Sequence, residues 1–130
     1  MEFIISFCLI VCLLLLLFTG KISYKLNQTN VSLFCTYWFP YVIEFTDIIS
    51  VKELNDFNSY GIRLCGLGNL RCGAGLFHNK VYGNYTLYSD FYACKHIELK
   101  TKEEKVIIIG LKDEKQLEDL LIVLNKRVLI

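Results

Sequence analysis

A run of sixteen residues near the N-terminus, Phe3 to Phe18, is apolar except for Ser6. A helix rises about 1.5 Å per residue, so the run spans roughly 24 Å, and Thr19 and Gly20 bring it near the hydrocarbon thickness of about 30 Å. Hydrophobic residues make up 54% of the 130-residue chain, and this run holds much of the excess. It divides the chain into residues 1–20 and residues 21–130, which suffice for one domain with its own core.

The residues that flank this run indicate how it is used. A cleaved secretory signal has Lys or Arg before the run and small residues at the cleavage site, whereas this chain begins with Glu2 and its run ends in Leu17-Phe18-Thr19-Gly20. Lys21 and Lys25 follow the run, and positive charge favours the cytoplasmic side. We therefore expect residues 1–20 to be a single-pass transmembrane anchor that contacts the lipid bilayer through residues 3–18. The domain would be cytoplasmic, and a cleaved signal peptide is the alternative.

The charges of the chain nearly cancel. There are 14 Lys and Arg residues against 13 Asp and Glu residues, which gives a formal net charge of +1. A chain without a strong positive field has no general attraction for nucleic acid. We expect no nucleic-acid partner.

Short strands are expected from Ile22 onward, because β-branched and aromatic residues are frequent and turn residues recur about every ten residues. Pro40, the only proline, fits a turn or an edge strand because it cannot donate to a ladder. Residues 79–80 and 102–103 fit tight connections between paired strands, and a meander is the simplest topology. The predicted strands are residues 31–38, 41–45, 48–53, 60–64, 75–78, 81–87, 93–99 and 106–109.

A C-terminal helix is predicted over residues 113–126. Asp113 can cap free amides, and Gln116 stands at the capping-box position. Leucines recur one helical turn apart, so the helix has one apolar face that must be buried, and it would close one end or face of a barrel. Acidic residues on the polar face argue against a helix lying on anionic lipid. The apolar stripe consists of Leu117, Leu120, Leu121 and Leu124.

Several short motifs follow one another between about residues 41 and 124. They are FTDIISV (45–51), GLG (66–68), CGAGLF (72–77), VYG (81–83), TLY (86–88), KVIII (105–109) and KDEKQL (112–117). In this order they resemble the bacterial pleckstrin-homology domain family, whose members join such domains to membrane helices. The resemblance implies a mainly β fold, a strongly bent antiparallel barrel of about seven strands closed by a C-terminal helix. It also implies a binding or assembly module without catalysis. The chain departs from the family pattern at Ala74-Gly75-Leu76, where a bulkier or basic residue is usual.

The glycine-rich stretch from residue 65 to residue 75 and its flanks hold the predicted ligand-binding residues. Its glycines lack the spacing of a dinucleotide loop, and no Gly-Lys-Ser or Gly-Lys-Thr follows. Guanidinium groups in this stretch can bind an anionic headgroup or a partner carboxylate through paired hydrogen bonds. The alternative is a solvated loop with ordinary surface arginines. The predicted residues are Arg63, Gly66, Gly68 and Arg71.

Four of the six cysteines fall within residues 21–130, namely Cys35, Cys65, Cys72 and Cys94. Four cysteines allow three disulfide pairings in an exported domain, whereas a cytoplasmic location keeps them reduced. Their spacing does not match the paired short intervals of a structural zinc site. We expect buried free thiols, no metal and no cofactor.

Cys94 and His96 are the one pair that suggests nucleophilic chemistry. Two residues apart on a strand, they would face the same way, and an imidazole can activate a thiol. No oxyanion feature is evident, and a lone histidine beside charged Lys95 and Glu98 is more often a surface residue. We therefore expect no enzyme.

Together these features predict a membrane-anchored, non-enzymatic binding or scaffolding module. A loop or an open sheet edge would recruit a protein partner or contact lipid headgroups. The alternative is an exported structural or interaction domain stabilised by disulfides. No small-molecule substrate is evident from the sequence.

Overall fold

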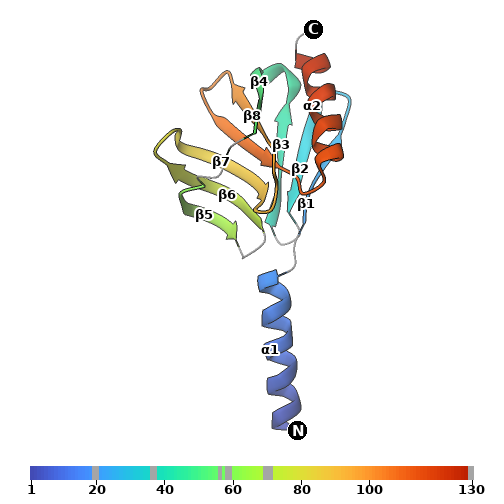
Figure 1. Cartoon of the computed structure of the whole chain (residues 1–130), viewed down its shortest axis with the longest axis vertical. Helices are drawn as coiled ribbons and strands as arrows, with labels where there is room; N and C mark the ends of the chain where they lie inside the picture. The colour runs from blue at the N-terminus through green and yellow to red at the C-terminus, as the bar shows by residue number, and fades with distance from the viewer. Residues whose placement is uncertain (19–20, 36–37, 56, 58–59, 69–71, 129–130) are drawn as a thin grey trace.

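The computed structural model describes residues 1–18, 21–35, 38–55, 57, 60–68 and 72–128. An N-terminal helix stands apart from a body of strands, and a C-terminal helix packs against that body (Figure 1). Half of the described residues lie in strands, so the predicted mainly β class is confirmed. The elements are α1 (Glu2–Phe18), β1 (Ile22–Leu26), β2 (Asn30–Cys35), β3 (Trp38–Glu44), the 3-10 helix η1 (Phe45–Asp47), β4 (Ile48–Leu54), β5 (Ile62–Gly68), β6 (Cys72–Asn79), β7 (Gly83–Asp90), β8 (His96–Thr101), β9 (Val106–Gly110) and α2 (Glu114–Val128).

The strands form two sheets. One has three strands in the order β1-β2-β3, and the other has six in the order β4-β8-β9-β7-β6-β5. β7 and β9 pair in parallel, while the other pairs are antiparallel. Each predicted strand overlaps an observed one, but β1 was not predicted. The predicted meander is wrong because β9 lies between β7 and β8.

The predicted barrel is also wrong. The six-stranded sheet ends at β4 on one side and at β5 on the other, and these two strands do not pair. The three-stranded sheet likewise ends at β1 and β3. Neither sheet closes on itself, and buried side chains of both sheets share one core cluster.

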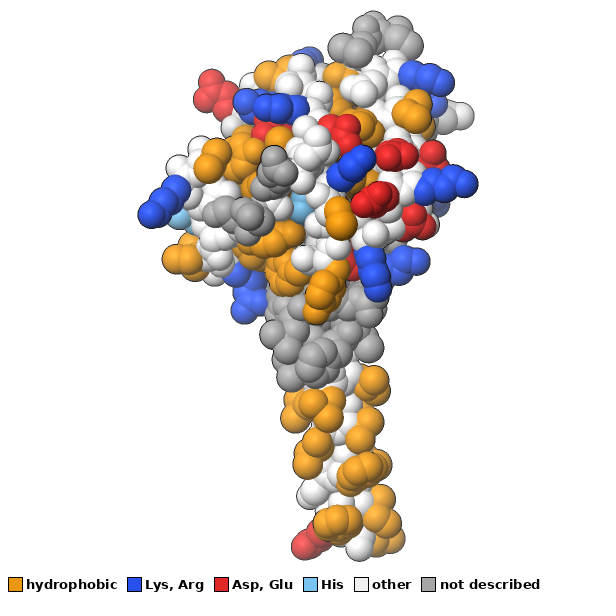
Figure 2. Space-filling model, viewed as in Figure 1, with side chains coloured by type: hydrophobic (Ala, Val, Ile, Leu, Met, Phe, Trp, Pro, Cys, Tyr) orange, Lys and Arg blue, Asp and Glu red, His pale blue; other side chains and the backbone are white. Residues whose placement is uncertain are grey.

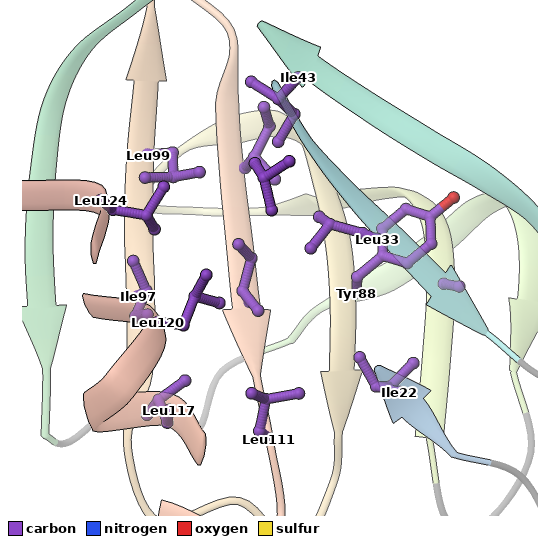
Figure 3. Packing of buried hydrophobic residues seen from close by; sticks show 14 of the residues in the cluster. Ile22, Leu33, Ile43, Tyr88, Ile97, Leu99, Leu111, Leu117, Leu120 and Leu124 are labelled. Atoms are coloured by element: carbon purple, nitrogen blue, oxygen red, sulfur yellow. The ribbon is translucent and has the colours of Figure 1, made fainter. Parts of the chain in front are cut away.

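The core lies on the face of the six-stranded sheet that we call the inner face. Ile97 and Leu99 alternate along β8, and Ile107 and Ile109 alternate along β9, so their side chains share this face. Leu33 of the three-stranded sheet reaches into the same cluster (Figure 3). All five side chains are fully buried.

α2 covers the remaining part of the inner face. Leu117, Leu120 and Leu124 are buried in the core cluster, and the helix contacts β4, β8 and η1 (Figure 3). The backbone N–H of Lys115 donates to Asp113 Oδ1 at 3.0 Å, which satisfies one free amide of the first turn. The predicted helix is confirmed, and its stripe is buried at three positions and partly buried at Leu121. The helix covers one face of an open sheet and closes no barrel.

The opposite face of the six-stranded sheet, the outer face, carries a second and smaller core. Phe77, Tyr85, Leu87 and Ile108 are buried there. Phe57 and Tyr60, described residues that lie between β4 and β5 in the chain, pack against this cluster. In the described part of the chain, individual side chains rather than a further sheet or helix therefore contact the outer face.

α1 differs from the transmembrane helix that the sequence predicts. Its 17 residues correspond to about 26 Å, below the hydrocarbon thickness of about 30 Å, and Thr19 and Gly20 lie outside the described residues. Among the residues that the structure describes, no helix is both long and apolar enough to cross a membrane. The predicted single-pass membrane location is therefore wrong. Figure 2 shows many apolar side chains on the surface of α1. Phe3 is 83% and Leu13 is 59% exposed.

Candidate functional site

β5 is the outer edge of the six-stranded sheet, with β6 on one side and no described strand on the other (Figure 1). An edge strand has backbone N–H and C=O groups that are free to pair with another chain. Ile62 is 69% and Leu64 is 52% exposed. The predicted binding residues Arg63, Gly66 and Gly68 all lie in this strand, whereas Arg71 lies outside the described residues.

The glycines of β5 serve the contact with β6. Gly66 is paired with Gly75, and both have a positive φ, +127° and +130°. A Cβ atom at Gly66 would stand 2.2 Å from the carbonyl oxygen of Ala74, so no other residue fits without displacing the backbone. The close approach of the β5 and β6 backbones explains why both positions are glycine. No bound anion is needed to explain them.

The strands at the other sheet edges make contacts that β5 lacks among the described residues. β3 contains Pro40, and the hydroxyl of Tyr88 donates to the carbonyl of Phe39 at 2.8 Å. At β1, the hydroxyl of Tyr24 donates to the carbonyl of Gln116 in α2 at 3.3 Å, and α2 also packs against β4. Proline and covering helices are common ways of blocking an edge. β5 has neither in the described part of the chain.

Exposed apolar side chains gather near this edge. We use the name β5 patch for Ile62, Leu64, Leu76 and Val81, which are 69%, 52%, 38% and 76% exposed. Leu76 is in the neighbouring strand and pairs with Cys65, while Val81 is in the turn after β6. Exposed apolar side chains on an edge strand and its neighbour are available for contact with a partner.

Arg63 supplies the only formal charge of β5. Its side chain is exposed, and a guanidinium group can bind a carboxylate with two parallel hydrogen bonds. The edge therefore offers backbone hydrogen bonds, apolar side chains and one positive charge.

A second candidate is a buried polar cluster on the outer face, centred on His96. Its ring is fully buried, and Nε2 lies 3.0 Å from the hydroxyl of Tyr60. Burial lowers the pKa of His96 to about 4, so the ring is neutral near pH 7. The surface position predicted for this histidine is wrong. The predicted alignment with Cys94 is also wrong, because Cys94 precedes β8 and is exposed.

The neighbours of His96 fill its surroundings. Gly110 pairs with Ser89 on one side and with His96 on the other. A Cβ atom at Gly110 would stand 2.2 Å from Ser89 Oγ and 2.7 Å from His96 Cδ2, so the missing side chain makes room for both. The Ser89 hydroxyl donates to the carbonyl of Asp90 at 3.0 Å. Ser89 is itself fully buried, which makes this cluster unsuited to act as a nucleophilic site.

Glu98 is a buried carboxylate on the same face. It accepts a hydrogen bond from the hydroxyl of Tyr82, and Lys100 Nζ lies 3.6 Å from its other oxygen. Burial and then the bond to Glu98 raise the pKa of Tyr82, so this phenol stays protonated. These contacts satisfy a buried charge and stabilise the fold. Sequence reasoning missed this cluster, although polar residues alternating with Ile97 and Leu99 were a signal for a two-faced strand.

Other candidate sites have less support. A groove of about 200 Å³ lies between the end of β3 and the β8–β9 turn, but charges of both signs line it, and Lys105 pairs with Glu103 at 3.2 Å. In the described residues, no group of three or more His, Cys, Asp or Glu side chains is placed to hold a metal ion.

The cysteines divide between core and surface. Cys35 and Cys72 are buried in the inner-face core, whereas Cys65 and Cys94 are exposed free thiols. The expectation of buried cysteines is therefore wrong for Cys65 and Cys94. Cys65 lies on the free edge of the sheet.

Searches against protein-family models, curated proteins and solved structures found no match to this chain. The resemblance to bacterial pleckstrin-homology domains stays a prediction, and the barrel that it implied is not the fold observed.

Proposed function

We propose that this chain is a non-enzymatic protein-binding module whose β5 edge accepts an extended segment of a partner protein. The observation that carries the proposal is the open position of β5 at the end of a six-stranded sheet, with Ile62 and Leu64 exposed. Strand addition at such an edge provides backbone hydrogen bonds for affinity and side-chain contacts for specificity.

The side chains of β5 define the chemistry of the segment. Residues that meet Ile62 and Leu64 gain by being apolar, since burial of apolar surface contributes about 25 cal/mol per Å². A residue that meets Arg63 gains by being acidic. The expected ligand is therefore an extended segment in which apolar and acidic residues alternate.

The experiment uses a defined probe, a capped ten-residue peptide of alternating valine and glutamate, titrated into the full-length chain. We expect amide signals of β5 to shift on binding in two-dimensional NMR spectra, with a dissociation constant of about 100 μM, a weak affinity for so small a contact. A peptide of alternating valine and lysine is the control, and it should bind at least tenfold more weakly.

Two substitutions make the test specific for the edge. Leu64 lies in a β-bulge between Arg63 and Cys65, where proline is tolerated, so Leu64→Pro should fold and abolish binding. Leu64→Val is the matched control and should bind normally. Arg63→Glu should reverse the preference between the two peptides. Undiminished binding by a folded Leu64→Pro chain, or no binding of either peptide to the unmodified chain, would refute the proposal.

A further inference from the structure

A groove of about 540 Å³ lies where three distant segments of the chain meet. They are the turn between β1 and β2, the start of η1 and the last turns of α2. The apolar residues that line the groove are Leu26, Phe45 and Val123. Its volume falls in the range of about 300 to 1,000 Å³ that is typical of small-molecule sites.

Arg127 is held at this groove by uncharged groups. Its Nη1 donates to the carbonyl oxygen of Gln28 at 3.3 Å, and its guanidinium carbon lies 5.8 Å from the centre of the Phe45 ring. Among the described residues, no carboxylate stands at ion-pair distance from Arg127, whereas Lys95 and Lys100 each pair with a carboxylate. The guanidinium is therefore fixed in place while its positive charge stays uncompensated.

The turn that supplies Gln28 is fixed by its own hydrogen bonds. The backbone N–H of Asn27 donates to the carbonyl of Asn30 at 2.9 Å, and Asn27 Nδ2 donates to Asn30 Oδ1 at 2.6 Å. The backbone N–H of Phe45 donates to the carbonyl of Thr29 at 3.0 Å and so joins this turn to η1. Since the groups around the guanidinium are already ordered, a ligand that binds it has less conformational freedom to remove.

The charge and the walls of the groove define the ligand. A guanidinium group has five N–H donors, and those of Arg127 that do not bond to Gln28 can take both oxygens of a carboxylate. The apolar residues beside it favour a ligand whose remaining part is apolar, because burial of apolar surface is favourable.

We propose that this groove binds a small carboxylic acid, with the carboxylate on Arg127 and an apolar body against Leu26, Phe45 and Val123. The inference goes beyond the proposed function, since α2 and β5 lie on opposite sides of the body (Figure 1). The peptide experiment at β5 and the experiment at this groove can therefore succeed or fail independently.

The experiment compares two ligands that differ only in charge. The full-length chain is titrated at pH 7 with 4-phenylbutyrate and with its neutral amide, 4-phenylbutanamide, and followed by two-dimensional NMR. We expect amide signals of Gln28, Val123 and Arg127 to shift with both ligands. The acid should bind about tenfold more tightly, because a hydrogen bond between charged groups contributes more than one to a neutral group. Equal affinities for acid and amide, or shifts confined to the exposed apolar helix α1, would overturn the proposal.

Substitution of Arg127 tests the pairing with the carboxylate. Arg127→Gln should lower the affinity for the acid about tenfold and leave the affinity for the amide unchanged, because only the acid uses the charge. Lys126→Gln removes the same charge from the neighbouring exposed residue and should change neither affinity. If Arg127→Gln weakened both ligands equally, or left the preference for the acid intact, Arg127 would not be the carboxylate partner.

A second pair of substitutions tests the position of the apolar body. Val123 lines the groove, whereas Ile122 is 52% exposed and is not among the lining residues. Val123→Ser should weaken the acid and the amide by the same factor of about four, since it removes apolar contact surface. Ile122→Ser is the matched control on α2 and should leave both affinities unchanged. Equal effects of the two serines would overturn the placement of the ligand in this groove.

Discussion

The two faces of the six-stranded sheet are stabilised in different ways. On the inner face, aliphatic side chains such as Ile107 and Ile109 meet a second sheet and a helix, and they are fully buried. On the outer face, aromatic rings and polar groups contact one another individually, and the ring centroids of Phe57 and His96 lie 5.0 Å apart. The inner face is stabilised by packing against continuous layers of structure, whereas the outer face is stabilised by individual contacts.

On the outer face, hydrogen bonds between side chains and backbone supply stability that the inner face gains from packing against a sheet and a helix. The hydroxyl of Tyr85 donates to the backbone carbonyl of Tyr60, and the hydroxyl of Tyr60 lies within hydrogen-bond distance of His96. Tyrosine suits this role because it combines a large apolar ring with a polar end. The stability of the outer face therefore depends on specific polar contacts. Removing one hydrogen-bonding atom or changing the pH should affect it more than it affects the inner face.

The largest effect is expected on the inner face. Leu120→Ala removes a fully buried side chain between α2 and the sheet, and the cavity should lower the free energy of unfolding by about 3 to 5 kcal/mol. Ile122→Ala, two residues along and 52% exposed, should change it by about 0.5 kcal/mol or less. Urea denaturation followed by circular dichroism measures both. Equal losses would mean that α2 does not cover the core as the structure shows.

A smaller, pH-dependent effect is expected on the outer face. The pKa of His96 is about 4 in the folded chain, below the usual value of about 6.5. Between about pH 4 and pH 6.5, the unfolded chain therefore binds a proton at this residue that the folded chain does not bind. Stability from the neutral ring is complete above pH 6.5 and should fall by up to about 3 kcal/mol as the pH drops to 4.

Urea denaturation at pH 7 and pH 4 checks this difference between the faces. His96→Gln should lose less stability over that range than the unmodified chain. His78→Gln replaces an exposed histidine that bonds to Asn84, and it should behave like the unmodified chain. If all three chains show the same dependence on pH, the buried histidine is not the cause.

The smallest effect concerns one hydroxyl of the outer face. Tyr60→Phe keeps the ring against Phe91 but removes the group that lies 3.0 Å from His96 Nε2, so a buried nitrogen loses its partner. The expected loss is about 1 to 2 kcal/mol. Tyr92→Phe alters a residue that is 65% exposed and should have no measurable effect. If Tyr60→Phe left the free energy of unfolding unchanged, ring packing alone would stabilise the contacts of the outer face.

Local patterns in the sequence predicted much of the secondary structure. The stripe that includes Leu117, Leu120 and Leu124 predicted a helix with one buried face, because side chains one turn apart share a face. Pro40 was correctly predicted as compatible with an edge, although it lies inside β3 rather than between two strands. The sequence did not predict β1, because its apolar run is short and is interrupted by Lys25 and followed by polar residues.

The candidate site was predicted only in part. The sequence indicated Arg63 and Gly66, but it suggested a loop that binds an anion, whereas both residues lie in an edge strand. Edge position depends on which strands pair, and pairing is set by contacts between distant residues. The cluster around His96 was missed for the same reason, since Tyr60 approaches it from a distant part of the chain.

The sequence by itself determined the mainly β class, the approximate strands, the C-terminal helix and its buried leucines, because each depends on the spacing of neighbouring residues. The tertiary structure alone decided that β9 pairs in parallel with β7, that the sheets stay open and that β5 is left at an edge. These features depend on how the whole chain buries its apolar surface, and no local pattern contains that information.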